Sequence, residues 1–263
     1  MSEDKKTVEV KEQKEPVVRK LRGKRERKDP WWKTLLIGLG FAAWVAVAFY
    51  ATQILCSLIF VAIMPADQLE RPIVNLIFAA VVYLIALILI VFLPWKVLKM
   101  KTTRDEVGMR GLPTWTDILL APIGFIAFMF ASTFLMMLMQ AILPGIDWEQ
   151  AQDVGFNNLI GSAEMIQGFI ALVVIAPIAE EIMFRGWLYG KLRARMSAIP
   201  AILICSLLFG LVHGQWNVGV TVFVMSIAMC MMRELTGTIW SGILLHMIKN
   251  GVAFYLLYVV HLA

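Results

Sequence analysis

The chain has 263 residues, of which 60% are hydrophobic and 16% charged, and its formal net charge is +5 at pH 7. Together with a mean hydropathy of +0.76, this balance excludes a water-soluble globular fold, whose apolar and polar shares are nearly equal. We expect an all-α, polytopic transmembrane helix bundle of about seven spans, within a range of six to eight. Nucleic acid is not expected as a partner, because the basic residues cluster at membrane boundaries without interleaved aromatics.

Residues 1–30 contain many Lys and Glu and almost no aromatic residues. Such a segment cannot bury enough apolar surface to fold alone, so we expect a disordered tail. Seven basic residues crowd together just before the first apolar run, namely Arg19, Lys20, Arg22, Lys24, Arg25, Arg27 and Lys28. Basic residues remain on the cytoplasmic side of a membrane. The sequence therefore predicts a cytoplasmic tail, followed by a single membrane domain over residues 31–263.

Seven apolar stretches follow the tail. They cover about residues 35–64, 73–95, 117–143, 165–185, 201–213, 217–232 and 238–260. The connections at 96–116 and 186–198 are basic, which predicts a cytoplasmic location. The connection at 144–157 contains three acidic residues and neither Lys nor Arg. We expect this connection on the outside of the membrane.

The fourth stretch contains three ionisable residues, Glu180, Glu181 and Arg185. Ionisable side chains within a membrane segment are costly unless they are paired or hydrated, so they indicate a functional site. Glu181 and Arg185 are four residues apart on one helical face, which predicts an ion pair that orders the helix. Glu180 is rotated about 100° away from Glu181. It is therefore the free carboxylate.

Two further stretches carry polar residues that can reach the same depth in the membrane. His213 lies at the end of the fifth stretch, and His246 and Asn250 share one face of the seventh. Gly242, on that same face, allows another helix to approach closely. A desolvated Glu acts as a general base, His holds or moves a proton, and His or Asn donors stabilise an oxyanion. This set of side chains is typical of a hydrolase.

The same residues carry a family resemblance. Glu180, Glu181 and Arg185 fit the pattern EExxxR, Phe209 and His213 fit FxxxH, and His246 and Asn250 fit HxxxN/D. In this order, the three motifs resemble those of the CAAX-protease and bacteriocin-processing (CPBP, or Abi) membrane proteins, relatives of the prenyl-protein CAAX endopeptidases. The resemblance covers about residues 160–255. It implies that Glu180 is the catalytic base, that His213 positions the water, and that His246 and Asn250 form the oxyanion hole.

The resemblance further implies a glutamate-type protease that needs no metal or other cofactor, acting on a membrane-associated peptide or protein. Zinc remains an alternative, because two His and one Glu can supply three ligands with an open fourth position. A proton-coupled or ion-coupled transporter also uses intramembrane Glu and His, although the repeat symmetry of transporters is not seen here. A catalytically silent scaffold or immunity protein is the remaining alternative.

Overall fold

The computed structural model describes residues 29–150, 152, 154–156 and 159–260, and within these ranges the regular elements are all helices. The all-α prediction is therefore confirmed. Most of the predicted tail, residues 1–28, lies outside the described residues. Over the described part of the chain, six helices are long and apolar enough to span a membrane, and Ala198–Leu211 is a shorter apolar helix. The fifth predicted span is this 14-residue helix, shorter than the roughly 20 residues that a bilayer requires.

The helices in chain order are α2 (Trp31–Ile63), α3 (Ala66–Leu69), α4 (Pro72–Leu87), α5 (Leu93–Leu98), α6 (Arg104–Val107), α7 (Trp115–Ile142), α8 (Ser162–Phe169), α9 (Ala176–Glu181), α10 (Tyr189–Arg193), α11 (Ala198–Leu211), α12 (Trp216–Thr236) and α13 (Trp240–Phe254). Four π-helical segments join or extend them, namely η1 (Ile88–Phe92), η2 (Ile170–Ile175), η3 (Ile182–Leu188) and η4 (Tyr255–Val259). As a result α8, α9 and α10 are parts of one long helix, Ser162–Arg193. This helix continues beyond residue 186, where the sequence predicted a loop.

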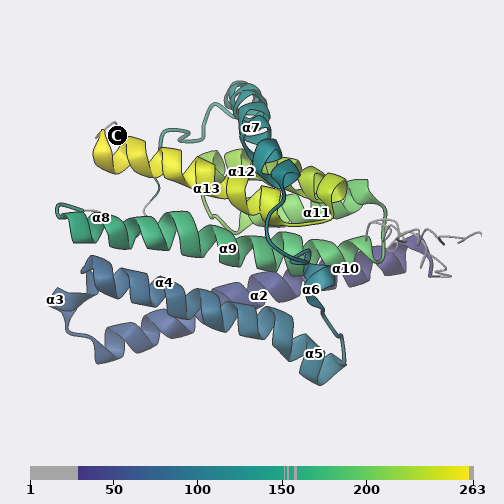
Figure 1. Cartoon of the computed structure of the whole chain (residues 1–263), viewed down its shortest axis with the longest axis horizontal. Coiled ribbons are helices and arrows are strands. Elements are labelled where there is room, and N and C mark those ends of the chain that lie inside the picture. Colours follow the sequence, from purple (N-terminus) through teal and green to yellow (C-terminus); the bar gives the residue numbers. More distant parts are fainter. Residues whose placement is uncertain (1–28, 151, 153, 157–158, 261–263) are drawn as a thin grey trace, which may run out of the picture.

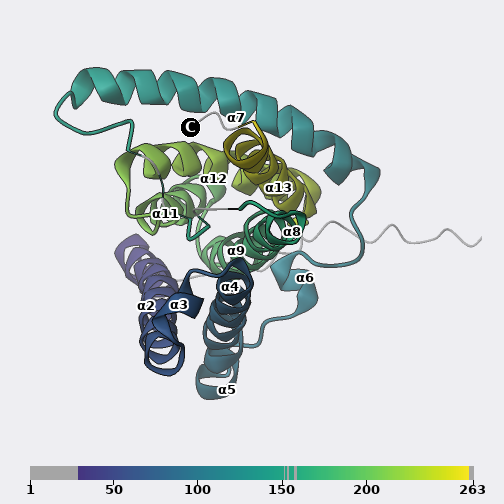
Figure 2. The same cartoon turned by 90° about the vertical axis from the view of Figure 1, so that its left-hand side faces the viewer.

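The helix α7 runs crosswise over α12 and α13, whereas the other long helices lie roughly alongside one another (Figures 1 and 2). A Cβ atom at Gly124 would lie 2.9 Å from the sulfur of Met232 on α12 and 3.0 Å from Leu245 Cδ1 on α13. The start of α7 is fixed by Asp117, which accepts a 2.7 Å hydrogen bond from the Thr238 hydroxyl. The sequence predicted this helix but not its direction, because apolar length does not determine tilt.

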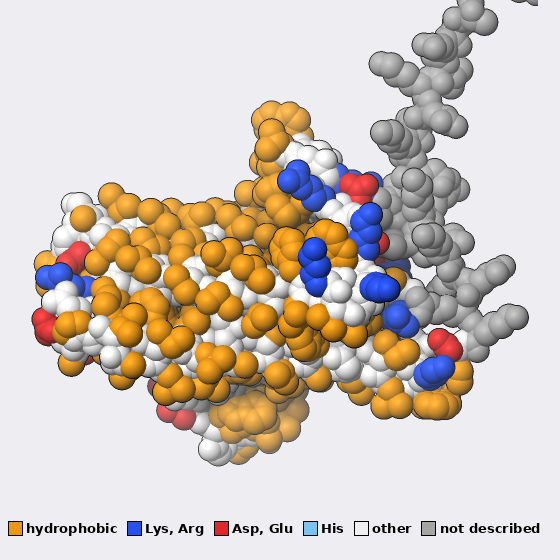
Figure 3. All heavy atoms as spheres, turned by 90° about the horizontal axis from the view of Figure 1, so that it is seen from below, with side chains coloured by type: hydrophobic (Ala, Val, Ile, Leu, Met, Phe, Trp, Pro, Cys, Tyr) orange, Lys and Arg blue, Asp and Glu red, His pale blue; other side chains and the backbone are white. Residues whose placement is uncertain are grey.

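The molecular surface matches a lipid environment. Figure 3 shows apolar side chains over the middle of the molecule and charged side chains near its two ends. On α7, the large residues Ile123, Phe130 and Phe134 are 61% to 76% exposed. Such a wide apolar surface is stable in contact with lipid tails and not in water. The chain is an integral membrane protein.

The helix that carries the two glutamates is irregular around them. The short segment α9 lies between η2 and η3, so the helix widens on both sides of the Glu-Glu pair. Within η2, the Ala176 N–H donates to the Ala171 carbonyl five residues earlier. Pro177 is next in the chain and has no N–H to donate to the Leu172 carbonyl. Single π turns of this kind often occur at functional sites.

Candidate active site

Glu181 and Arg185 lie together, as their four-residue spacing predicts. Arg185 Nη1 is 2.9 Å from Glu181 Oε1, and both side chains are completely buried. A Cβ atom at Gly242 would lie 3.0 Å from Glu181 Oε2, so the absence of a side chain there lets α13 approach the carboxylate. Two opposite charges that are removed from water together must remain paired, because either one alone would be strongly destabilising.

Glu180 has different surroundings from its neighbour. The Tyr83 hydroxyl on α4 donates a 2.5 Å hydrogen bond to Glu180 Oε1. The second oxygen, Oε2, is 3.9 Å from His246 Nε2, and the Glu180 side chain is 13% exposed, compared with 0% for Glu181. Glu180 is therefore the more accessible carboxylate. As a carboxylate oxygen, its Oε2 atom can accept a hydrogen bond from water.

His246 lies between the two glutamates. Its Nδ1 atom is 3.2 Å from Glu181 Oε1, and its Nε2 atom faces Glu180. Because the Arg185-paired carboxylate acts as an acceptor, we assign the ring hydrogen to Nδ1. In a neutral ring Nε2 is then an acceptor. Donation from Nε2 to a substrate oxyanion therefore requires a ring that is protonated on both nitrogens.

The distance between Glu180 Oε2 and His246 Nε2 is compatible with a single bridging water molecule. Hydrogen bonds of about 2.8 Å from a water oxygen to Glu180 Oε2 and His246 Nε2 close a triangle with the 3.9 Å separation. The angle at the water oxygen is then roughly 90°, within the range that a hydrogen-bonded water adopts. The pair thus defines a place where a water molecule contacts a carboxylate and an imidazole at once.

His213 lies two residues beyond the end of α11, and not on the helix as the sequence predicted. The helix ends here because Gly214 adopts a left-handed conformation, with a φ of +70° that favours glycine. His213 Nδ1 is 2.7 Å from the Phe209 carbonyl oxygen, which only accepts, so Nδ1 carries the hydrogen. Its Nε2 is left as an acceptor. The ring is close enough to Glu180 to interact with it electrostatically.

Phe209 joins the parts of the site. Its ring centre is 4.9 Å from that of His213 and 6.0 Å from that of His246, with both pairs edge to face. The Arg185 guanidinium lies over the same ring at 4.1 Å. Edge-to-face and cation–π contacts stabilise such arrangements. The Phe of the FxxxH pattern thus holds both imidazoles and the buried arginine in place.

Asn250 contacts the irregular helix directly. Its Nδ2 atom donates a 2.8 Å hydrogen bond to the Leu172 carbonyl. Pro177, five residues further along the helix, has no N–H and cannot donate to this carbonyl. An amide nitrogen carries two hydrogens, so one remains for another acceptor. The structure therefore gives Asn250 a structural contact in addition to the oxyanion role that the resemblance implies.

The site contains a second cation. Lys249 lies between the two motif residues of α13 and is close enough to Glu180 and His213 for electrostatic interaction. Glu181 is already paired with Arg185, and Lys249 is a cation within electrostatic reach of Glu180. Lys249 lies within the predicted span at 238–260 but belongs to none of the three motifs.

Sequence reasoning missed Tyr83. The residue lies in the second apolar stretch, far from the three motifs, and its phenol does not stand out as an ionised group does. One signal was present: Tyr83 is the single tyrosine of the predicted span at 73–95. A buried phenol needs a hydrogen-bond partner, and intramembrane carboxylates are few.

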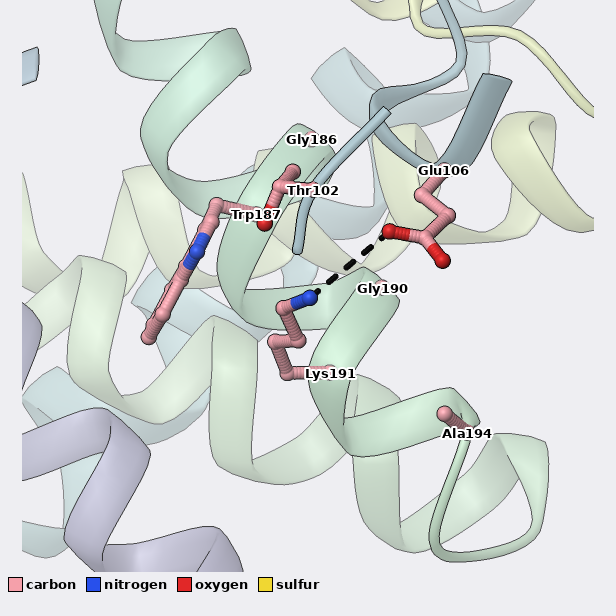
Figure 4. A pocket seen from close by; sticks show the side chains of 7 residues that line it. All are labelled: Thr102, Glu106, Gly186, Trp187, Gly190, Lys191 and Ala194. Carbon is pink, nitrogen blue, oxygen red and sulfur yellow. Dashed lines mark ion pairs between the residues drawn. The ribbon is translucent and has the colours of Figure 1, made fainter. Parts of the chain in front are cut away.

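A separate hollow of about 50 Å³ lies between α6 and the η3–α10 region (Figure 4). It is lined by Thr102, Glu106, Gly186, Trp187, Gly190, Lys191 and Ala194. Lys191 points across it towards Glu106, with Nζ 3.7 Å from Oε2, and donates to the Lys101 carbonyl at 3.1 Å. The two charged groups already have each other as partners. This hollow contains none of the motif residues, and the candidate site lies elsewhere.

Comparison with known proteins agrees with the motifs. Residues 162–252 match the family described as type II CAAX prenyl endopeptidase Rce1-like. The protein UPF0177 YxdF of Lactococcus lactis subsp. lactis (strain IL1403) is 26% identical over 129 residues, which cover 49% of this chain and 67% of the relative. No solved structure matches the chain. All seven motif residues fall within 162–252, the segment that is similar to this family.

Proposed function

We propose that the chain is an intramembrane endopeptidase that hydrolyses a peptide bond of a membrane-associated peptide or protein by means of a water molecule activated by Glu180. The observation that carries this proposal is the 3.9 Å approach of Glu180 Oε2 to His246 Nε2 within the membrane domain. A partly accessible carboxylate beside an imidazole is the arrangement that water activation needs. The match to the Rce1-like family supports a peptidase over a transporter or a silent scaffold.

The proposed reaction uses these groups in turn. Glu180 takes a proton from the water while the water oxygen forms a bond to the scissile carbonyl carbon. His213 accepts a hydrogen bond from the same water through Nε2. Negative charge develops on the former carbonyl oxygen, which accepts hydrogen bonds from the Asn250 amide and from Nε2 of His246 in its doubly protonated form. Collapse of the intermediate breaks the C–N bond, and Glu180 delivers its proton to the leaving amine.

We propose that this mechanism requires no metal ion. Among the described residues, no group of three or more His, Cys, Asp or Glu side chains is placed to hold one. Purified protein should therefore keep its activity after thorough chelation and contain no stoichiometric zinc. If zinc is the catalyst, chelation abolishes activity, added zinc restores it, and replacement of a ligand removes the bound metal.

We propose that the basic connections at 96–116 and 186–198 face the cytoplasm, together with the N-terminal tail, and that the 144–157 connection faces outward. Single cysteines at exposed positions of these segments, such as Lys99 and Glu149, provide the test. A membrane-impermeant thiol reagent added to intact cells should label only the cysteine at position 149. Labelling of position 99 from the outside would reverse the orientation.

The substrate can be sought with an inactive variant. Glu180→Gln keeps the shape of the side chain but removes the base, so the substrate should accumulate uncleaved in cells that carry this variant. Mass spectrometry of membrane peptides should show fragments that are present with the wild type and absent with Glu180→Gln. An identical set of fragments from both strains would contradict the assignment of Glu180.

A further inference from the structure

We propose that α2 and α4, which precede the matched segment, complete the active site through two tyrosine hydroxyls. Tyr83 on α4 is a positioning residue for Glu180, and Tyr50 on α2 is a weaker one for the turn that carries His213. The inference rests on the proposed peptidase function. It adds that the family-matched residues 162–252 form an incomplete site without the N-terminal helices.

The contact between Tyr83 and Glu180 decides which carboxylate oxygen faces the reaction. Torsion about the last bond of a Glu side chain is broad and roughly two-fold, so either oxygen can occupy either position. The 2.5 Å hydrogen bond from the Tyr83 hydroxyl holds Oε1. That leaves Oε2 on the side of His246, 3.9 Å from its Nε2 atom, a separation that one water molecule can bridge. Without the hydroxyl, the carboxylate loses this orientation.

The proton of Tyr83 also suits a positioning role. A phenol is ordinarily neutral and donates its single hydrogen, and a carboxylate accepts it. The bond therefore occupies Glu180 Oε1 without supplying a competing base. In the proposed reaction Tyr83 keeps its proton throughout, while Glu180 Oε2 receives the proton from water. The hydroxyl acts through the carboxylate and contacts no reacting atom.

The ring of Tyr83 is itself supported by α2. Phe49, which is 7% exposed, lies with its ring centre 6.1 Å from that of Tyr83 at an interplanar angle of 37°. The same Phe49 ring is 6.1 Å from the ring of Tyr50. Aromatic rings at these separations pack favourably. One buried phenylalanine thus connects the two tyrosines and holds the phenol of Tyr83 towards the site.

Tyr50 reaches the other side of the site. Its hydroxyl donates a 3.0 Å hydrogen bond to the Val212 carbonyl, directly before His213. The side chain is 40% exposed, unlike that of Tyr83, and its partner is a backbone group one residue away from the imidazole. The contact fixes the turn and not the imidazole itself. We therefore expect a smaller effect from Tyr50 than from Tyr83.

The test compares Tyr→Phe substitutions, each of which removes one hydroxyl and keeps the ring. The variants are Tyr83→Phe, Tyr50→Phe and, as a matched control, Tyr255→Phe, at a position that is 55% exposed on η4. The probe is a synthetic copy of one peptide that the wild type cleaves rapidly and Glu180→Gln cleaves only at a small residual rate. Tyr83→Phe should lower kcat by about 10- to 100-fold, the usual effect of losing a group that orients an active-site residue. KM should stay within about two-fold, because uniform binding is unchanged.

A double substitution separates positioning from stability. In the Glu180→Gln background, Tyr83→Phe should cause no further loss of the residual rate, because the carboxylate that it orients is already gone. A merely structural tyrosine would lower the amount of folded protein in both backgrounds. Tyr50→Phe should lower kcat by less than Tyr83→Phe, and Tyr255→Phe should match the wild type.

An infrared measurement tests the contact without any substrate. The carboxyl bands that disappear in Glu180→Gln should shift in Tyr83→Phe and stay in place in Tyr255→Phe. Unshifted bands, or equal kcat for wild type and Tyr83→Phe, would overturn the proposal. Failure of the peptidase function itself is distinguishable, since no peptide would then be cleaved by the wild type and spared by Glu180→Gln.

Discussion

The two neighbouring glutamates differ more than any other adjacent pair in the site. Glu181 is completely buried, paired with Arg185 at 2.9 Å, and lies against Gly242. Glu180 is 13% exposed, is held by a neutral hydroxyl on one oxygen, and faces an imidazole with the other. A carboxylate that is paired with a buried guanidinium cannot lose its charge without destabilising the fold. A carboxylate with a free and accessible oxygen is able to take a proton.

The largest expected effect on stability comes from breaking the buried pair. Glu181→Gln leaves the Arg185 guanidinium without its counter-charge and should lower the free energy of unfolding by about 3–5 kcal/mol, because an unpaired buried charge is costly. Detergent or thermal unfolding of the purified protein measures this loss. Glu234→Gln is the matched control, since Glu234 pairs with Arg193 at 2.7 Å in a site where its side chain is 24% exposed. Glu234→Gln should lower the free energy of unfolding by clearly less than Glu181→Gln. Equal losses in the two variants would contradict the distinction between buried and accessible carboxylates.

Asn250→Ala should lower the turnover of folded protein by about 100-fold if the amide donates to the oxyanion. The same substitution also removes the hydrogen bond to the Leu172 carbonyl, at a cost of about 1–3 kcal/mol for a buried acceptor left without a partner. Rates normalised to the folded fraction separate the two effects. Lower stability with an unchanged normalised rate would show that Asn250 serves only the irregular helix.

A smaller effect tests the close approach at Gly242. In Gly242→Ala the new Cβ atom meets Glu181 Oε2 at 3.0 Å, and such overpacking costs about 1–3 kcal/mol. His246 follows on the same helix, so cleavage should slow as well. Gly40→Ala is the control, because a Cβ atom there meets nothing within 4 Å. It should be neutral or slightly stabilising, since Ala favours helix more than Gly does.

Much of the fold follows from the sequence, because apolar length and charge placement are enough to locate membrane helices. The four-residue spacings placed Glu181 beside Arg185, and the glycine on the facing helix indicated the close approach at Gly242. The crosswise path of α7 was not predictable in the same way. It depends on which small residue meets which neighbouring helix, here Gly124 against α12 and α13.

The motifs located the candidate site but not all of its contacts. Two contacts were hidden because each joins a motif residue to a residue outside the motifs that is distant in the sequence. Tyr83 reaches Glu180 across 97 positions of the chain, and Asn250 reaches Leu172 across 78. His213 was placed on a helix because the fifth apolar stretch was read as extending to residue 213, yet that helix ends at Leu211, before Gly214. Local sequence patterns predict which residues share a helix face and where a helix ends. Contacts with residues of other helices can be identified only in the folded structure.

The most direct test of the central claim measures cleavage and stability for Glu180→Gln and Glu181→Gln side by side, in the same membranes and with the same peptide. We expect Glu180→Gln to unfold at the wild-type temperature and to lose about 100- to 10,000-fold in rate, the usual contribution of a general base. Glu181→Gln should unfold at a lower temperature than the wild type and retain more activity per folded molecule than Glu180→Gln. Wild-type cleavage by stably folded Glu180→Gln would contradict the claim that this carboxylate activates the water.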